Sequence, residues 1–205
     1  MNYPEFQARA DELIEAGHFL NSRGWVPATS GNFSARLGED RIAVTVSGSH
    51  KGYLSRDDFT VVDGLGQSLD GCRPSAETLL HTGLYQRFPG IRAVLHAHTP
   101  GSVLASRLFA DEVALENHEL LKVLAGIASH EARVAVPIFP NDQDMPRLAA
   151  QVDRYLEGHG DTPGYIIGGH GVYTWGDSVA AALRHLEALE FMFDIEIRLH
   201  GVKTP

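Results

Sequence analysis

The segment 94–99, Val-Leu-His-Ala-His-Thr, is the part of this chain that most restricts its fold. Its apolar start is typical of a buried strand, and His96 and His98 stand two residues apart at its end. Residues i and i+2 of a strand project from the same face, so the two imidazoles can point at one position. Two neutral imidazoles on one face are half of a site for a divalent transition metal. The alternative is a hydrogen-bonded histidine pair at a strand end.

Size and charge limit the classes of protein to consider. A chain of 205 residues with ordinary composition predicts one domain, residues 1–205, with an ample core. A net charge of −9 without a Lys/Arg cluster argues against a nucleic-acid partner. The single cysteine, Cys72, excludes an internal disulfide and suits a reducing compartment. The start of the sequence shows no basic region followed by an apolar run, so we expect no signal peptide. No apolar stretch approaches membrane length, so we expect a cytoplasmic protein that does not bind membranes.

Hydrophobic periodicity and turn residues predict helices that alternate with strands. The expected helices are 4–22, 74–88, 100–109, 117–124, 144–156 and 177–199. The expected strands are a short one within 29–36, then 42–46, 59–62, 92–96, 133–138, 164–167 and 172–175. Several strands follow one another through short turns. We therefore expect an α/β fold of three layers, αβα, with a mixed, mostly antiparallel central sheet.

A third histidine strengthens the metal interpretation. His170 lies between Gly169 and Gly171, directly after a buried apolar run. Flanking glycines let the backbone turn sharply and leave room for a ligand. A histidine in a turn is often only solvated, so His170 gains its weight from the strand-end pair. Three histidines with an open fourth position are typical of a catalytic zinc site.

Two glutamates are candidates for proton transfer. Glu77 and Glu119 are each expected in the first turn of a helix. A carboxylate at that position also stabilises the helix dipole, so a structural role is the alternative for both. Abstraction of a proton next to a carbonyl requires a carboxylate near the metal. At least one of the two should therefore be functional if the metal site is real.

Two glycine turns offer groups that suit a phosphate. Ser30-Gly31-Asn32 and Ser47-Gly48-Ser49 provide backbone N–H groups and hydroxyls, and Ser75 stands at an expected helix start. Lys51 could add a positive charge. Glycine turns are usually no more than turns, so each of these signals is weak alone.

The motifs together resemble the class II aldolase/adducin family. The matching segments, in the family's order, are Ser30–Ser34, Ser47–Gly48, Pro74–Glu77, His96–His98 and His170–Gly171. The resemblance implies one zinc ion per subunit, held by His96, His98 and His170. It also implies a phosphate pocket near Asn32, Ser47, Gly48 and Ser75. Members are usually symmetric homo-oligomers, often tetramers, with sites near subunit interfaces.

The two glutamates match different branches of the family. In the sugar-phosphate aldolases the glutamate of the Ser-x-Glu segment is the general base, which corresponds to Glu77. In the dehydratases the glutamate of the segment matching 118–122 is the acid/base, which corresponds to Glu119. Ala76 replaces the second serine of the aldolase segment, which loosens the phosphate assignment. We assign the acid/base role to Glu119, with Glu77 as zinc neighbour or second carboxylate.

The segments 118–122, 143–146 and 170–176 are most similar to members that dehydrate 5-methylthioribulose 1-phosphate to 2,3-diketo-5-methylthiopentyl 1-phosphate in methionine salvage. In this reaction zinc stabilises an enediolate of a small ketose 1-phosphate, and water leaves from C4. The alternatives are an aldolase or epimerase acting on a sugar phosphate such as fuculose 1-phosphate, and a non-catalytic interaction module as in adducin. The intact histidine and glutamate set argues against the module, since a scaffold needs no metal site.

Overall fold

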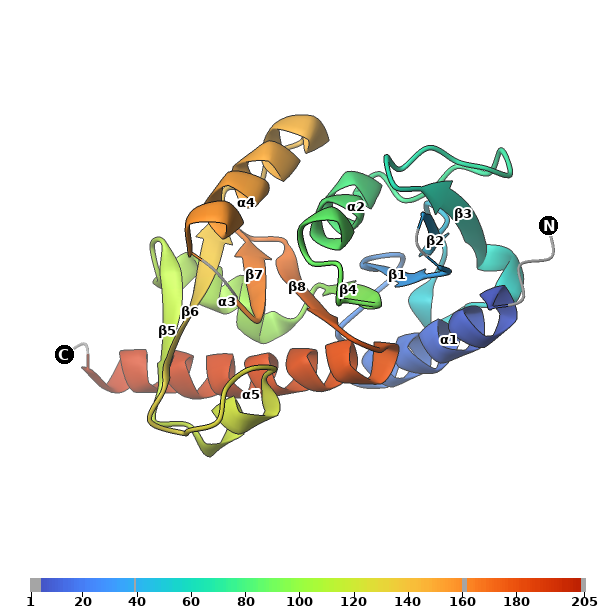
Figure 1. Ribbon diagram of the computed structural model, residues 1–205. Helices are drawn as coiled ribbons and strands as arrows, with labels where there is room; N and C mark the ends of the chain where they lie inside the picture. Colours follow the sequence, from blue (N-terminus) through green and yellow to red (C-terminus); the bar gives the residue numbers. More distant parts are fainter. Residues whose placement is uncertain (1–4, 39, 160–161, 204–205) are drawn as a thin grey trace.

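The computed structural model describes residues 5–38, 40–159 and 162–203, and its centre is an eight-stranded sheet (Figure 1). The strands are β1 (Asn32–Arg36), β2 (Arg41–Thr45), β3 (Phe59–Asp63), β4 (Ala93–Ala97), β5 (Glu112–Glu116), β6 (Arg133–Phe139), β7 (Gly164–Ile167) and β8 (Gly171–Gly176). Their order in the sheet is β3-β2-β1-β4-β8-β7-β6-β5. Of the neighbouring pairs, only β6 and β7 are parallel. The predicted mixed, mostly antiparallel sheet is therefore confirmed.

Helices cover both faces of the sheet, as the αβα expectation requires (Figure 1). The helices are α1 (Phe6–Ser22), α2 (Thr78–Arg87), α3 (Pro100–Leu108), α4 (Met145–His159) and α5 (Val179–Lys203). Helices α1, α3 and α5 pack with Leu95 of β4 in one apolar cluster. Helices α2 and α4 pack with Val94 in a second cluster. Successive strand residues point to opposite faces, so this one strand contributes to both cores.

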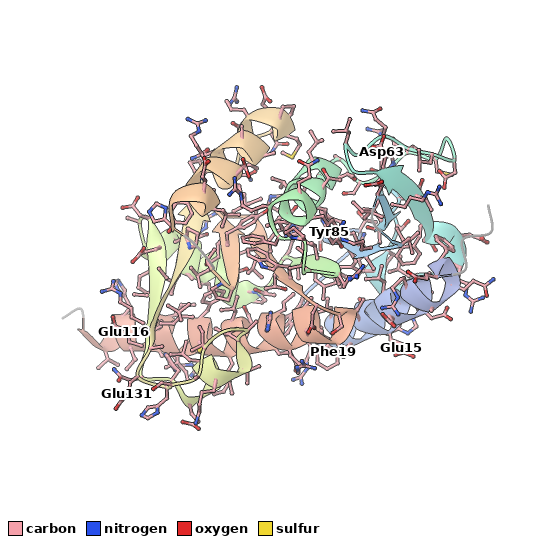
Figure 2. All side chains as sticks on the ribbon, viewed as in Figure 1. Glu15, Phe19, Asp63, Tyr85, Glu116 and Glu131 are labelled. Atoms are coloured by element: carbon pink, nitrogen blue, oxygen red, sulfur yellow. The ribbon has the colours of Figure 1, made fainter. Side chains whose placement is uncertain are left out.

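Side chains fill the space between the layers, whereas the charged Glu15, Glu116 and Glu131 lie at the periphery (Figure 2). None of the described helices is long and apolar enough to cross a membrane. The first expected helix is present from Phe6, and position 4 lies outside the described residues.

Three local expectations were wrong. Strand β5 was not predicted, because its five residues were read as a connection between two helices. Helix α2 begins at Thr78, not at 74, since Ser75 belongs to the preceding turn and its carbonyl accepts from the Thr78 N–H at 3.1 Å. The expected helix 117–124 is a short 3₁₀ helix, η3 (Glu119–Val123). Such helices are too short for a 3.6-residue pattern to identify.

Candidate metal centre and active site

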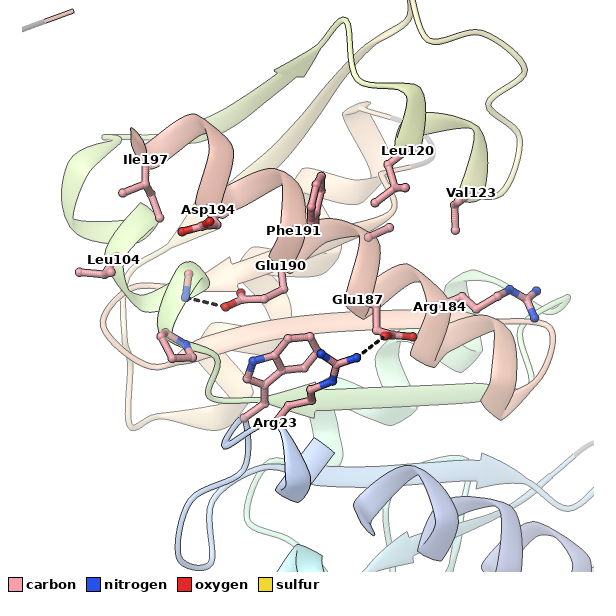
Figure 3. A pocket seen from close by; sticks show the side chains of 14 residues that line it. Arg23, Leu104, Leu120, Val123, Arg184, Glu187, Glu190, Phe191, Asp194 and Ile197 are labelled. Carbon is pink, nitrogen blue, oxygen red and sulfur yellow. Dashed lines mark hydrogen bonds and ion pairs between the residues drawn. The ribbon is translucent and has the colours of Figure 1, made fainter. Parts of the chain in front are cut away.

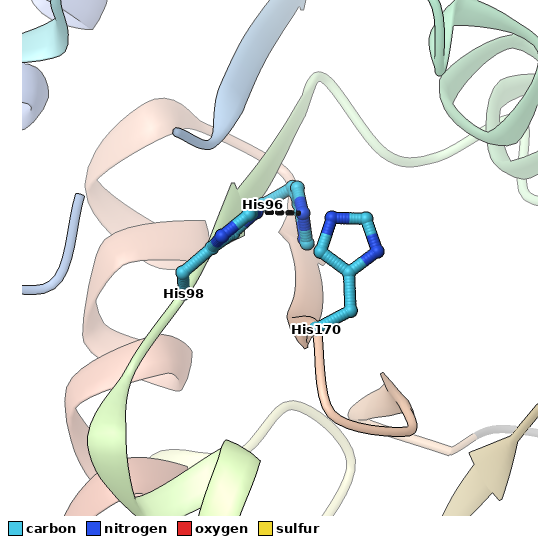
Figure 4. A group of neighbouring side chains, drawn as sticks. All are labelled: His96, His98 and His170. Atoms are coloured by element: carbon cyan, nitrogen blue, oxygen red, sulfur yellow. Dashed lines mark hydrogen bonds between the residues drawn. The ribbon is translucent and has the colours of Figure 1, made fainter. Parts of the chain in front are cut away.

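Three imidazoles converge where β4 ends and β8 begins (Figure 4). His96 lies in β4, His98 follows that strand, and His170 occupies the turn before β8. Because β4 and β8 are antiparallel, the end of one strand meets the start of the other. One nitrogen of each ring lies within 4.8 Å of the others, and the Nε2 atoms of His96 and His98 are 3.0 Å apart. The structure thus brings together all three histidines that the sequence singled out.

The surroundings keep the His96 and His98 rings neutral. Burial lowers the pKa of His96 well below its ordinary value, and burial together with the neighbouring His170 lowers the pKa of His98 to about 4. His96 Nδ1 lies 3.1 Å from the carbonyl oxygen of Val172, so Nδ1 carries the proton and Nε2 is left as an acceptor. A neutral ring oriented by a backbone carbonyl is the form in which histidine binds a metal.

The donor set fits a transition-metal ion. Imidazole nitrogens are the ligands that zinc, iron and copper accept in proteins. The Nδ1 atom of His170 is buried and has no hydrogen-bond partner within the described part of the chain. A buried polar atom normally has a partner, so its lack here is consistent with a ring that is placed for a ligand.

Glu77 lies against the same imidazoles. Its carboxylate is 3.4 Å from His96 Nε2 and 3.2 Å from His170 Nε2. It also accepts hydrogen bonds from the Tyr173 hydroxyl and, at 2.9 Å, from the Asn32 amide. Burial alone would raise the pKa of Glu77, but His96, Tyr173 and Asn32 together hold it at about 2. The carboxylate is therefore ionised at neutral pH.

A buried chain of hydrogen bonds leads to Glu77 from the opposite side. The Asn32 amide nitrogen donates to Glu77, so its oxygen accepts from His81 Nε2. His81 Nδ1 must then accept from the Ser34 hydroxyl, at 2.7 Å, and Ser34 Oγ accepts from the Tyr85 hydroxyl at 2.9 Å. Each member has one defined donor direction, which fixes both the His81 tautomer and the orientation of Asn32.

The sequence analysis did not identify His81 or Tyr173 as members of the site. His81 lies four residues after Glu77, and this helical spacing was an available signal. Tyr173 stacks on the His96 ring with centroids 4.1 Å apart because β8 pairs with β4 in that register. A register between distant strands leaves no mark in one sequence.

The structure groups three of the expected phosphate-binding residues. Ser47 and Gly48 form the exposed turn after β2, and the Ser47 N–H donates to the carbonyl of Arg73 at 3.2 Å. The Ser75 N–H donates to the carbonyl of Thr45 at 3.1 Å, which holds the segment before α2 beside this turn. The three residues thus lie close together, but none of them is among the residues that line the cavity at the imidazoles.

The other two expected phosphate ligands are engaged elsewhere. The Asn32 amide is used by Glu77 and His81. Lys51 is only 2% exposed, and its ammonium donates to the carbonyls of Thr29 and Ser49. Burial lowers the pKa of Lys51 to about 8. Its charge therefore lies beneath the turns and does not project into solvent.

Glu119 is far more exposed than Glu77. It begins η3, its side chain is 74% exposed, and it pairs with Lys122. His130 Nδ1 lies 4.0 Å from its carboxylate. Within one chain, Glu119 is not among the residues that line the cavity at the imidazoles.

The imidazoles of His98 and His170 open into a cavity of about 410 Å³, whereas His96 is fully buried. Its lining residues are Ala76, Glu77, His98, Asn141, Gln143, Met145, Gly169 and His170. A larger, more apolar cavity of about 610 Å³ lies along α5, between α3 and η3 (Figure 3). There Glu190 accepts from the Gly101 N–H at 2.8 Å, but none of the three histidines lines that cavity. The smaller cavity is therefore the candidate active site.

Two glycines allow the backbone to approach His96 closely. A Cβ atom on Gly171 would overlap the carbonyl oxygen of Ala97 and lie 3.0 Å from His96 Cε1. Gly31 has a φ of +74°, and a Cβ there would lie 2.6 Å from the His96 carbonyl oxygen. Both positions therefore require glycine for steric reasons, and Gly31 also requires it for its backbone conformation.

Comparison with known proteins identifies the family. Residues 11–197 match the family described as "Class II Aldolase and Adducin N-terminal domain". The chain therefore belongs to the class II aldolase and adducin family, as its motifs indicated. The methylthioribulose-1-phosphate dehydratase of Methylococcus capsulatus is 63% identical over 203 residues, which are 99% of this chain and 100% of that protein.

Two further proteins extend the comparison. The methylthioribulose-1-phosphate dehydratase of Pseudomonas paraeruginosa is 53% identical over 190 residues, 92% of this chain and 93% of that protein. The crystal structure of YgbL from Escherichia coli superposes with a TM-score of 0.80 at 25% identity, covering 95% of this chain and 90% of that one. The first shows that the similarity to dehydratases spans nearly the whole chain, and the second shows that the fold is shared more widely.

Proposed function

We propose that this chain is a lyase that dehydrates 5-methylthioribulose 1-phosphate to 2,3-diketo-5-methylthiopentyl 1-phosphate in methionine salvage. One observation carries the proposal: Glu77 lies against a group of three imidazoles beside a cavity, in a chain whose full-length relatives are dehydratases of this name. The enzyme would act on a free metabolite, so we expect a cytoplasmic protein with no nucleic-acid or membrane partner.

We assign one zinc ion per subunit to His96, His98 and His170. When bound there, zinc supplies a Lewis acid that withdraws electron density from the ketone oxygen of the substrate. The Val172 carbonyl fixes the His96 tautomer, and burial keeps His96 and His98 unprotonated. The chain thereby presents ligand atoms without first having to lose protons.

The reaction needs a base at C3 and an acid at the C4 hydroxyl. Removal of the C3 proton gives an enediol, departure of the C4 hydroxyl as water leaves a C3 enol, and its tautomerisation gives the second ketone. We assign both proton transfers to Glu119, which can return the C3 proton to the leaving hydroxyl. Glu77, ionised and hydrogen-bonded on several sides, keeps His96 and His170 in position as the second carboxylate.

Glu119 can take this role only if another copy of the chain supplies it. We therefore propose a homo-oligomer, a tetramer, in which Glu119 of one subunit enters the cavity of its neighbour. The surface beside η3 supports this arrangement. Phe191 is 57% exposed and Val123 is 39% exposed, and both line the larger cavity along α5. A contiguous apolar area of this kind is typical of an interaction surface.

We place the phosphate at the turn formed by Ser47 and Gly48, beside Ser75. The serine hydroxyls suit a phosphate, and the buried Lys51 would add charge from beneath. Asn32, which was first expected to bind the phosphate, would instead orient Glu77 through its amide hydrogen bond.

Metal analysis followed by a product assay tests this function. We expect one zinc per subunit and one water lost per substrate, with the diketone as product. Release of dihydroxyacetone phosphate would show cleavage of the C3–C4 bond and hence an aldolase. Purified protein that binds no stoichiometric metal and has no activity would support the non-catalytic alternative.

A further inference from the structure

One wall of the active-site cavity is the segment 141–145, which leads into α4 and includes the first residue of that helix. Asn141, Gln143 and Met145 all line the cavity. The two residues between them, Asp142 and Asp144, instead bind a guanidinium group outside it. The side chains of this segment that line the cavity are therefore distinct from the two that bind the guanidinium group.

Arg147 in the first turn of α4 holds this segment. Its Nε and Nη2 atoms donate to the two carboxylate oxygens of Asp142 at 2.5 and 2.6 Å. Its Nη1 donates to Asp144 at 3.2 Å, and its backbone N–H donates to the same carboxylate at 3.0 Å. Paired carboxylates around one planar guanidinium fix orientation better than a single exposed ion pair does.

Met145 differs chemically from most of the cavity wall. The polar side chains of the wall are Glu77, His98, Asn141, Gln143 and His170. Apart from Gly169, the apolar members are Ala76 and Met145. Ala76 directly follows Ser75, a candidate for binding the phosphate at C1. We therefore assign Met145, the other apolar side chain, to the C5 end of the substrate. Met145 is partly buried and packs against the apolar cluster beneath α2 and α4, so its position is supported from behind.

We propose that Met145 determines specificity for the C5 substituent of the substrate, and that Arg147 is the positioning residue that holds it in place. The inference rests on the proposed dehydration of 5-methylthioribulose 1-phosphate. That substrate ends in a methylthio group, which is neutral and apolar. A methionine thioether is a flexible, polarisable contact for such a group. Removal of one such contact in a pocket typically changes selectivity by about tenfold.

The test compares two substrates that share the reacting carbons. One is 5-methylthioribulose 1-phosphate, and the other is 5-deoxyribulose 1-phosphate, which lacks only the methylthio group. Met145→Ala should lower kcat/KM for the first by about tenfold through KM, and leave the second within about twofold. Met145→Leu keeps an apolar side chain of similar volume and should retain most of the selectivity. An equal loss on both substrates would overturn the assignment.

Arg147→Lys tests the positioning role, because lysine cannot bind two carboxylates in the same planar geometry. We expect a higher KM for the methylthio substrate, an unchanged kcat and an unchanged KM for the deoxy substrate. Arg154→Lys, an exposed change further along α4, is the matched control and should alter neither. Arg147→Lys kinetics equal to those of the control would remove Arg147 from the proposal.

The wild-type protein separates the two levels of inference. If it dehydrates neither substrate, the proposed function fails and this inference fails with it. If it dehydrates both with equal kcat/KM, the proposed function stands and the role of Met145 is refuted. Thermal unfolding of each variant checks that it is folded. We expect folded variants, because Met145 is only partly buried and Arg147 is exposed.

Discussion

The two candidate carboxylates, Glu77 and Glu119, lie in opposite kinds of surroundings. Glu77 is mostly buried and contacts two imidazoles, a tyrosine hydroxyl and an amide, all from its own chain. Glu119 is 74% exposed and pairs with Lys122 on the same short helix. The environment of Glu77 is complete within one chain, whereas that of Glu119 is not. Under the proposed function, one subunit would complete the metal site, whereas proton transfer by Glu119 would need a second subunit.

The largest expected effect is on the part that one chain completes. His98→Ala removes one of three metal ligands, so the variant should lose stoichiometric zinc and all measurable dehydratase activity while remaining folded. Metal analysis and circular dichroism check this. His130→Ala, an exposed histidine near Glu119, is the matched control and should keep its zinc. A zinc-replete His98→Ala enzyme would mean that the three-histidine centre is wrong.

The next effect separates the two carboxylates. Glu119→Gln should retain zinc and lower kcat by about 10²–10⁴-fold, because it removes the proton-transfer group and no ligand. Steady-state kinetics with metal analysis measure both properties. An active Glu119→Gln variant beside an inactive, zinc-replete Glu77→Gln variant would reverse our assignment of the base.

Mixed oligomers test where Glu119 acts. Co-expression of His98→Ala and Glu119→Gln chains should restore part of the activity, because some sites then combine an intact metal centre with an intact Glu119 from a neighbour. Purified mixed oligomers, isolated through two affinity tags, should be at least about tenfold more active than either parent oligomer. No restoration in verified mixed oligomers would place Glu119 and the metal in the same chain, or outside the reaction.

A smaller effect concerns the buried network behind Glu77. Burial lowers the pKa of His81 to about 4, so the folded state favours the neutral ring. The contribution of His81 to the free energy of unfolding is therefore fully present above pH 6.5. As the pH falls towards 4, up to about 3 kcal/mol of it is lost, because the unfolded chain takes up a proton on this ring before the folded chain does. Urea unfolding at several pH values should show a weaker dependence for His81→Gln than for wild type. His18→Gln, at an exposed position, is the control variant. A pH dependence of unfolding in His81→Gln equal to that of wild type would contradict the prediction.

The smallest effect is expected at the exposed carboxylate. Lys122→Ala removes the ion-pair partner of Glu119, but exposed pairs of this kind contribute little to stability. The melting temperature should change by less than about 1 °C. Differential scanning calorimetry measures it, and a shift of several degrees would show that η3 is more tightly held than its exposure indicates.

Local patterns in the sequence predicted much of the metal centre. The i, i+2 histidines followed from strand geometry, and His170 followed from its flanking glycines. The alternation of strands and short turns predicted the mixed sheet. In each case the information lies within about ten residues of the position concerned.

The parts that were missed depend on long-range pairing or on short elements. Tyr173 reaches Glu77 only through the register of β8 against β4. Which side chains of 141–145 face the cavity depends on the hydrogen bonds between Arg147 and Asp142. Strand β5 and η3 are each five residues long, too short for periodicity to distinguish from loops. Neither a register nor a closed loop has a signature in a single sequence.

The close approach of Gly31 and Gly171 to His96 has a consequence for genetics. A larger residue at either position would push on the end of the strand that carries His96, although neither glycine has a side chain that could take part in chemistry. A random screen for inactive variants should recover these two positions as readily as the histidines themselves. An allele at either one would look like an active-site mutation in a growth assay, while its defect lies in the spacing of the backbone.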